Sequence, residues 1–177
     1  GRQGVEALLV DRDAAGELVN EQFVTFFVRG FDDGRQLGEL SPSHKLDPKL
    51  RDSDPAFGFT QRIDDDQTFR YADASGDPMP IHLDEDAAEA AGLPGIIAHG
   101  FCVLAFTSWG ILQGLGVEDP SRLKRLAARF AKPVLPGQEI ETRGWATGSG
   151  GDGSTFAFET AVGDTLVIRD GLAEFGG

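Results

Sequence analysis

An aspartate and a histidine flank a stiff turn in the stretch SGDPMPIHLDEDA, residues 75–87. A carboxylate and an imidazole at a fixed separation can share one water molecule, take a proton from it and deliver a proton to a substrate. Pro78 and Pro80 restrict the backbone between Asp77 and His82, because proline fixes its own φ and constrains the preceding residue. The alternative is a structural turn with a solvated Asp77 and a packed His82. The local sequence by itself favours that alternative.

A backbone donor for a developing oxyanion is predicted in IIAHG, residues 96–100. We expect Gly100 in the first turn of a helix, where N–H groups lack an intrahelical acceptor and the helix dipole favours negative charge. Such a donor can hold a thioester carbonyl as it becomes enolate-like. His99 could equally start the helix or orient a loop by hydrogen bonding, and we assign it no proton transfer.

Three helices would position these groups. The longest is predicted over residues 99–115, and its apolar residues lie on nearly every side, as in a buried helix. Two shorter ones are predicted at 66–76 and 85–92, with Asp66 and Asp84 as candidate N-caps. The acidic first turn of the second suits the helix dipole, and this explains its carboxylates better than metal binding does.

Strands are predicted at both ends of the chain. Residues 5–10 and 19–29 read as a β-hairpin, which needs a larger sheet to join. The polar stretch 31–59 is predicted to be an interdomain linker, with His44 solvated inside it. Four strands in a meander are predicted after Pro120. One buried helix against a mainly antiparallel sheet gives the α+β class.

Composition excludes several classes of partner. The 177 residues carry a net charge of −13, which opposes binding to nucleic acid or an anionic membrane. No apolar run is long enough to cross a bilayer, and the first residues lack the features of a signal peptide. A single cysteine, Cys102, excludes an internal disulfide and argues against a cysteine-based metal cluster. We therefore expect a cytoplasmic protein.

Three ordered segments carry a family resemblance. They are YADASGD at 71–77, PIHLD at 80–84 and AGLPGIIAHG at 91–100, and they are followed by RF at 129–130 and PVLPG at 133–137. Together they resemble the hydratase-2 motif of MaoC-like, (R)-specific enoyl-CoA hydratases. The resemblance covers residues of about 60–177, and an ordered series of this length outweighs the structural alternative for the turn.

The resemblance implies a hot-dog fold, in which a curved antiparallel sheet wraps a long central helix. It implies that Asp77 and His82 hold the catalytic water and that the Gly100 amide binds the thioester carbonyl. Ser108 matches a serine near the site in relatives, although a small residue needed for close packing is an equal alternative. The implied reaction is syn addition of water to a trans-2-enoyl thioester, or its reversal, giving a (3R)-hydroxyacyl thioester without a metal or redox cofactor.

The resemblance also implies a domain organisation. Residues 1–30 resemble the closing strands of a noncatalytic N-terminal hot-dog, so that 31–59 would be a linker and 60–177 the catalytic domain. We expect the earlier part of that first half to precede this sequence. Because hot-dog units pair, a homodimer or a pseudo-dimer with the upstream half is expected.

Several alternatives stay open. Met79 stands where the family usually has asparagine, which replaces a hydrogen-bonding side chain by a flexible apolar one. A noncatalytic acyl-thioester-binding or partner subunit, or a hot-dog thioesterase, is the alternative function. Coenzyme A phosphates or an acidic acyl carrier protein could meet a basic row on 122–129, although a solvated strand edge explains it equally well. The basic row consists of Arg122, Lys124, Arg125 and Arg129, and Lys132 follows it with the same expected role.

Overall fold

A computed structural model describes residues 2–29, 41–150 and 153–176 of the chain. The chain divides into two compact units, Gly1–Ser43 and His44–Gly177. None of the helices in the described ranges combines the length and the apolar character that a membrane crossing requires.

The first unit is the predicted hairpin. Strands β1 (Arg2–Arg12) and β2 (Leu18–Arg29) pair antiparallel. The turn between them is closed by Asp13, whose Oδ1 accepts the N–H groups of Ala15 and Glu17. Large apolar side chains of both strands are nevertheless exposed: Leu8, Leu9, Val10, Leu18, Val19, Phe23 and Phe26. Since exposed apolar patches of this kind mark surfaces that meet a partner, the hairpin has the character of a piece of a larger sheet.

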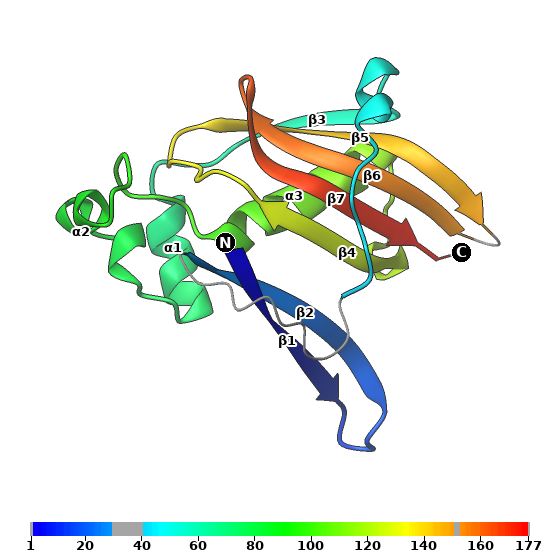
Figure 1. The fold of residues 1–177 in the computed structure, drawn as a ribbon, viewed down its shortest axis with the longest axis horizontal. Coiled ribbons are helices and arrows are strands. Elements are labelled where there is room, and N and C mark those ends of the chain that lie inside the picture. Colours follow the sequence, from blue (N-terminus) through cyan, green and yellow to red (C-terminus); the bar gives the residue numbers. More distant parts are fainter. Residues whose placement is uncertain (1, 30–40, 151–152, 177) are drawn as a thin grey trace. The chain divides into compact units, whose positions relative to one another are not determined.

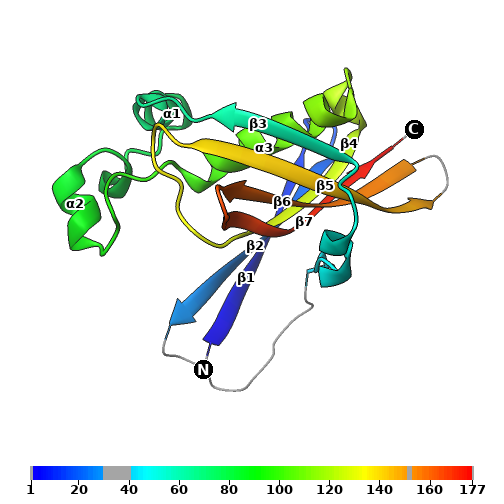
Figure 2. The ribbon, with the colours of Figure 1, turned by 90° about the horizontal axis from the view of Figure 1, so that it is seen from above.

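The second unit has one sheet and one long helix, as shown in Figures 1 and 2. Its sheet is antiparallel with the strand order β3-β5-β6-β7-β4. The elements are β3 (Phe57–Arg62), α1 (Gln67–Ser75), α2 (Glu85–Ala90), α3 (Gly100–Leu115), β4 (Leu123–Phe130), β5 (Glu139–Gly150), β6 (Gly153–Val162) and β7 (Thr165–Phe175), with the 3-10 helices η1 (Pro48–Asp52), η2 (Pro80–His82) and η3 (Pro120–Arg122). The predicted α+β class and hot-dog architecture are confirmed.

The predicted meander is wrong for its first strand. Strands β5, β6 and β7 are consecutive neighbours, but β4 pairs with β7 at the edge of the sheet. The connection after β4 does not form a hairpin, because it packs across the beginning of α3. Val134 in this connection is buried, and its carbonyl accepts the N–H of Ala98 at 2.8 Å.

The predicted linker is also wrong in its second part, while residues 30–40 lie outside the described residues. Residues 44–59 include η1 and the start of the edge strand β3. Leu46 is buried in a small cluster with Trp145, and the ring of His44 donates through Nδ1 to the Asp170 carbonyl. His44 is therefore bonded rather than solvated. Single long-range contacts anchor this polar stretch, and such contacts leave no periodicity in a sequence.

Helix α3 packs one side on the sheet. Glycines permit the close approach, because a Cβ at Gly114 would lie 2.8 Å from the Phe57 ring of β3. The other side of α3 is exposed, so the prediction of burial all round is wrong: Phe101 and Trp109 are 61% and 55% exposed. A single sheet covers only one side of a helix, and among the described residues of the second unit nothing covers the exposed side chains of Phe101 and Trp109.

Candidate active site

The predicted Asp–His turn joins α1 to α2 and is held by local hydrogen bonds. Helix α1 ends at Gly76, which adopts the left-handed conformation that glycine tolerates best, with φ of 70°. The Oδ1 of Asp77 accepts the N–H of Met79 at 3.3 Å, and His82 closes η2 by donating its N–H to the Met79 carbonyl. This fixes the separation of Asp77 and His82, as the prolines predict.

The turn is tied to the segment that leads into α3. Ile97 donates its N–H to the Ile81 carbonyl at 3.2 Å, and its own carbonyl accepts from His82 Nδ1 at 2.8 Å. His99 Nε2 lies 3.0 Å from the carbonyl oxygen of Asp77 and donates to it. Residues 77–82 and 96–100 therefore form one hydrogen-bonded unit, the Asp–His corner.

The hydrogen bond of His82 determines which ring nitrogen can take a proton. A carbonyl oxygen only accepts, so Nδ1 carries the hydrogen and Nε2 of the neutral ring keeps its lone pair. Burial has the largest effect on the pKa of His82 and lowers it below its usual 6.5. The Ile97 carbonyl raises the pKa, the nearby His99 lowers it, and the Asp77 carboxylate raises it. The net lowering keeps His82 uncharged near neutral pH, as a proton acceptor requires.

Three titratable groups converge in this corner. One side-chain ligand atom from each of Asp77, His82 and His99 lies within 4.8 Å of the others. One water molecule can bridge groups at this separation. A metal ion would have to displace existing bonds, because Nε2 of His99 bonds the Asp77 carbonyl and Nδ1 lies 3.2 Å from the hydroxyl of Thr68.

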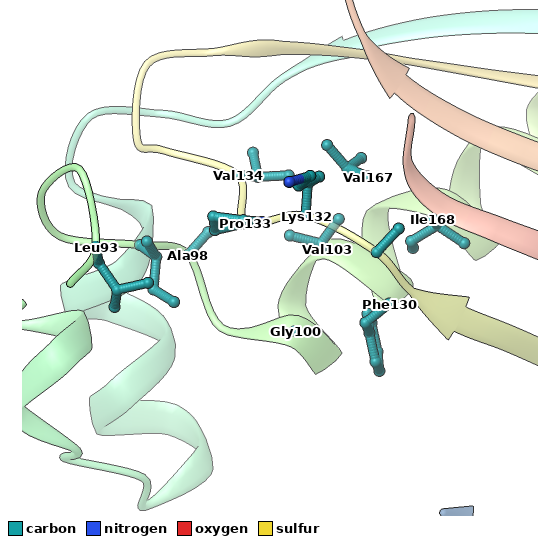
Figure 3. Close-up of a pocket in the computed structure, with 12 residues that line it drawn as sticks. Leu93, Ala98, Gly100, Val103, Phe130, Lys132, Pro133, Val134, Val167 and Ile168 are labelled. Carbon is teal, nitrogen blue, oxygen red and sulfur yellow. The ribbon is translucent and has the colours of Figure 1, made fainter. Parts of the chain in front are cut away.

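Gly100 follows His99 as the first residue of α3, so its N–H has no acceptor within the helix. It lines a cavity of about 290 Å³, shown in Figure 3, between the start of α3, residues 130–134 and β7. The walls are mainly apolar, with Val103, Val134 and Ile168 among them, and Phe130 and Lys132 complete the lining. Asp77 and His82 do not line this cavity, which thus adjoins the corner through Gly100.

Residues 48–167 match the family model described as "MaoC like domain". The chain belongs to this family. Over 148 residues it is 33% identical to "Probable enoyl-CoA hydratase 2" of Dictyostelium discoideum, covering 81% of this chain and 50% of that protein. It is 32% identical over 167 residues to "3-hydroxyacyl-thioester dehydratase Y" of Mycobacterium tuberculosis, covering 91% of this chain and 55% of that protein.

The fold of this MaoC-like chain is shared with a solved structure, the MaoC-like dehydratase from Phytophthora capsici. The TM-score is 0.83 at 26% identity, covering 96% of this chain and 57% of that one. The chain spans about half the length of the curated relatives it matches.

Ser108 and the basic row of this MaoC-like chain lie outside the corner. Ser108, one of the residues expected near the site, donates its hydroxyl to the Ala105 carbonyl of its own helix. In the basic row, Arg122 bonds the Gly176 carbonyl and Arg125 pairs with Glu174 at 3.0 Å. Lys124 is exposed and Arg129 half-buried on the same strand. None of these five lines the cavity.

Two residues with contacts at the site, Thr68 and His99, were given no catalytic role from the sequence. Lys132 was named together with the basic row as a candidate phosphate contact, and of these five residues it alone lines the cavity. Thr68 of α1 is fully buried beside His99, and no motif marks it. His99 itself had a signal, since it precedes the glycine of the MaoC-like motif, and of its two predicted roles the structure has hydrogen bonding to the turn.

Proposed function

We propose that this MaoC-like domain catalyses the reversible, (R)-specific addition of water to a trans-2-enoyl thioester, giving a (3R)-hydroxyacyl thioester. The observation that carries the proposal is the Asp–His corner: a carboxylate and a proton-accepting imidazole within 4.8 Å of each other, in the same hydrogen-bonded unit as Gly100, the first residue of α3. The names of the relatives, an enoyl-CoA hydratase 2 and a 3-hydroxyacyl-thioester dehydratase, describe the two directions of this reaction.

The proposed mechanism assigns one role to each group. Nε2 of His82 takes a proton from water as its oxygen attacks C3, while the Asp77 carboxylate accepts the other O–H of the same water. Negative charge develops on the thioester oxygen, where the N–H of Gly100 donates to it. His82 then returns the proton to C2 on the same face, which makes the addition syn. Oxidation states are unchanged overall, so the scheme includes neither a metal nor a redox cofactor.

The thioester carrier is coenzyme A or an acyl carrier protein. Lys132 at the cavity and the exposed members of the basic row could meet phosphates or an acidic partner. We assign the cavity beside Gly100 to part of the thioester, because its walls are mainly apolar and one cation, Lys132, lies among its lining residues.

We further propose that this domain works with a second hot-dog half, in a pseudo-dimer or a homodimer. The exposed apolar residues of the hairpin and of α3 support such a partner. The relatives' length, about twice the matched segment, supports an upstream half whose closing strands are residues 1–30. Ser108 and the cytoplasmic location remain predictions.

The test is an assay of the full coding chain with trans-2-butenoyl-CoA. We expect loss of enoyl absorbance, and chiral analysis should give the (3R)-hydroxy product. Asp77→Asn keeps the size of the side chain and removes its charge, so it should abolish turnover while the thermal midpoint stays near that of the parent.

Other results of the same assay would support one of the alternative functions. Release of free thiol without hydration would indicate a thioesterase. Thermal stabilisation by enoyl-CoA without any chemistry would indicate a binding subunit, and would mean that Met79, exposed beside Asp77, marks a site that has lost activity.

A further inference from the structure

His99 stands at the N-cap of α3 but does not cap it. Its side chain makes no capping hydrogen bond to the helix. The ring is 2% exposed, and its partners lie on other elements: the Asp77 carbonyl at Nε2 and Thr68 Oγ1 at Nδ1. A buried imidazole is costly unless it is hydrogen-bonded, and here both bonds serve residues around the Asp–His turn rather than the helix.

The ring of His99 also sets the plane of the His82 ring. The two rings stack with centroids 3.8 Å apart and planes inclined by 24°. His99 thereby touches both members of the pair, the backbone of Asp77 through a hydrogen bond and the ring of His82 through its face.

Thr68 determines how His99 is oriented. Because the Asp77 carbonyl only accepts, Nε2 carries a hydrogen, and Nδ1 of the neutral ring is then an acceptor. The Thr68 hydroxyl lies 3.2 Å away and is fully buried, and its one hydrogen can be donated either to this nitrogen or to the His82 carbonyl. The same hydroxyl oxygen lies 3.0 Å from the His82 carbonyl, so α1 is in contact with both histidines.

We propose that His99, oriented by Thr68, is a positioning residue of the hydration site that fixes Asp77 and His82 around the shared water. The inference rests on the proposed function for its reaction, but the geometry it invokes does not depend on turnover. A histidine needed only to begin α3 would be replaceable by any good N-cap residue. A positioning histidine would not.

His99→Asn separates the two roles, because asparagine is a strong N-cap yet cannot stack on His82 or reach both partners. We expect kcat on trans-2-butenoyl-CoA to fall roughly ten- to a hundredfold, as for a small misplacement of reacting groups, with KM within about twofold. Thr68→Val should lower kcat in the same direction. Thr68→Ser, which keeps the hydroxyl, is the matched control and should stay near the parent.

A titration of the His82 ring by NMR gives a readout that needs no turnover. Removing the His99 ring removes one cause of the lowered His82 pKa and opens the ring to water, so the midpoint should rise in His99→Asn and stay in Thr68→Ser. The other ionisable groups nearby are the Asp77 carboxylate, Tyr71, whose ring lies against His99, and Cys102, which interacts with Tyr71 and Arg70. Burial raises the pKa of both Tyr71 and Cys102, so neither becomes charged in this range.

The outcomes are distinguishable. If the parent chain shows no turnover, the proposed function fails, while a raised His82 midpoint in His99→Asn still supports positioning. If His99→Asn keeps both the parental kcat and the parental midpoint, His99 only begins the helix and the inference is overturned. If His99→Asn loses thermal stability, the titration midpoint of His82 is measured on its folded fraction. Thr68→Val then serves as the second variant.

Discussion

The Asp–His corner and the β4 side of the cavity are built in opposite ways. In the corner, Asp77 and His82 are both hydrogen-bonded to the segment that leads into α3, and His82 is only 7% exposed. On the β4 side, Phe130 is 48% exposed and Lys132 lies at the surface, on the segment that follows an edge strand. The side chains of the corner are held by hydrogen bonds, whereas on the β4 side the backbone is paired with β7 and the side chains of Phe130 and Lys132 are exposed.

This difference indicates a division of labour. Proton transfer depends steeply on position, so the groups that perform it need a rigid, cross-bonded frame. Contacts with an acyl chain or a phosphate tolerate variation, because apolar packing and surface charge are less directional. Changes in the corner should therefore act on kcat, and changes on the β4 side on KM and on substrate preference.

The largest effect is expected from His82→Gln. Glutamine can still donate to the Ile97 carbonyl but cannot accept a proton, so kcat should fall by roughly 10²- to 10⁴-fold, the usual contribution of general acid–base catalysis. Steady-state kinetics with trans-2-butenoyl-CoA measure this. Lys132→Ala is the matched change on the β4 side and should keep kcat while raising KM. Equal losses of kcat in the two variants would contradict the division.

The next effect is the pH dependence of the parent chain. His82 must be uncharged to accept a proton, and its pKa lies below 6.5. The value of kcat/KM for hydration should stay level as pH falls through 6.5 and decline about tenfold per pH unit only below the lowered pKa. A pH profile of initial rates checks this, and an acid limb at or above 6.5 would contradict it.

The free energy of unfolding should also depend on pH through the protonation of His82. The pKa of His82 is lower in the folded chain than in the unfolded one, so below 6.5 the unfolded chain binds more protons. The free energy of unfolding should therefore decrease as pH falls from 7 through this range. Denaturant titrations of the parent and of His82→Gln separate this contribution, because the variant lacks the titrating ring and should lose that part of the slope.

A smaller effect is expected from Phe130→Leu on the β4 side. The Phe130 ring lies against the start of α3, where a Cβ added at Gly100 would be 3.5 Å from it, and it lines the cavity. Shortening it should change the ratio of kcat/KM between short and longer enoyl chains by about tenfold or less, since about one methylene of space is worth that order. An unchanged ratio across a chain-length series would place the acyl group elsewhere.

The features that could be predicted from the sequence are those set by local residues, and the features that could not are those set by contacts between distant segments. Asp77, His82 and Gly100 lie in two short runs with proline, glycine and capping signals, so local chemistry marked them as candidates, and the ordered family motif then outweighed a merely structural turn. The position of β4, the edge strand β3 and the exposed face of α3 depend on pairing between distant segments, which leaves no local pattern. Thr68 was missed for the same reason, because its importance comes only from the histidines that fold against it.

The smallest effect, and the one that tests the β4 side most finely, is expected from the double variant Arg122→Ala, Lys124→Ala. Both side chains are exposed, and surface charges contribute little once salt screens them. If they meet the phosphates of coenzyme A, KM for enoyl-CoA should rise about twofold at low salt and return to the parental value at high salt, with kcat unchanged.

The N-acetylcysteamine thioester of the same acyl group has no phosphates and is the matched control, so its KM should not change. A shift for both substrates would mean that the substitutions act through the strand, whereas a shift for neither would mean that the basic row is a solvated edge and that Lys132 is the cation nearest the thioester carrier.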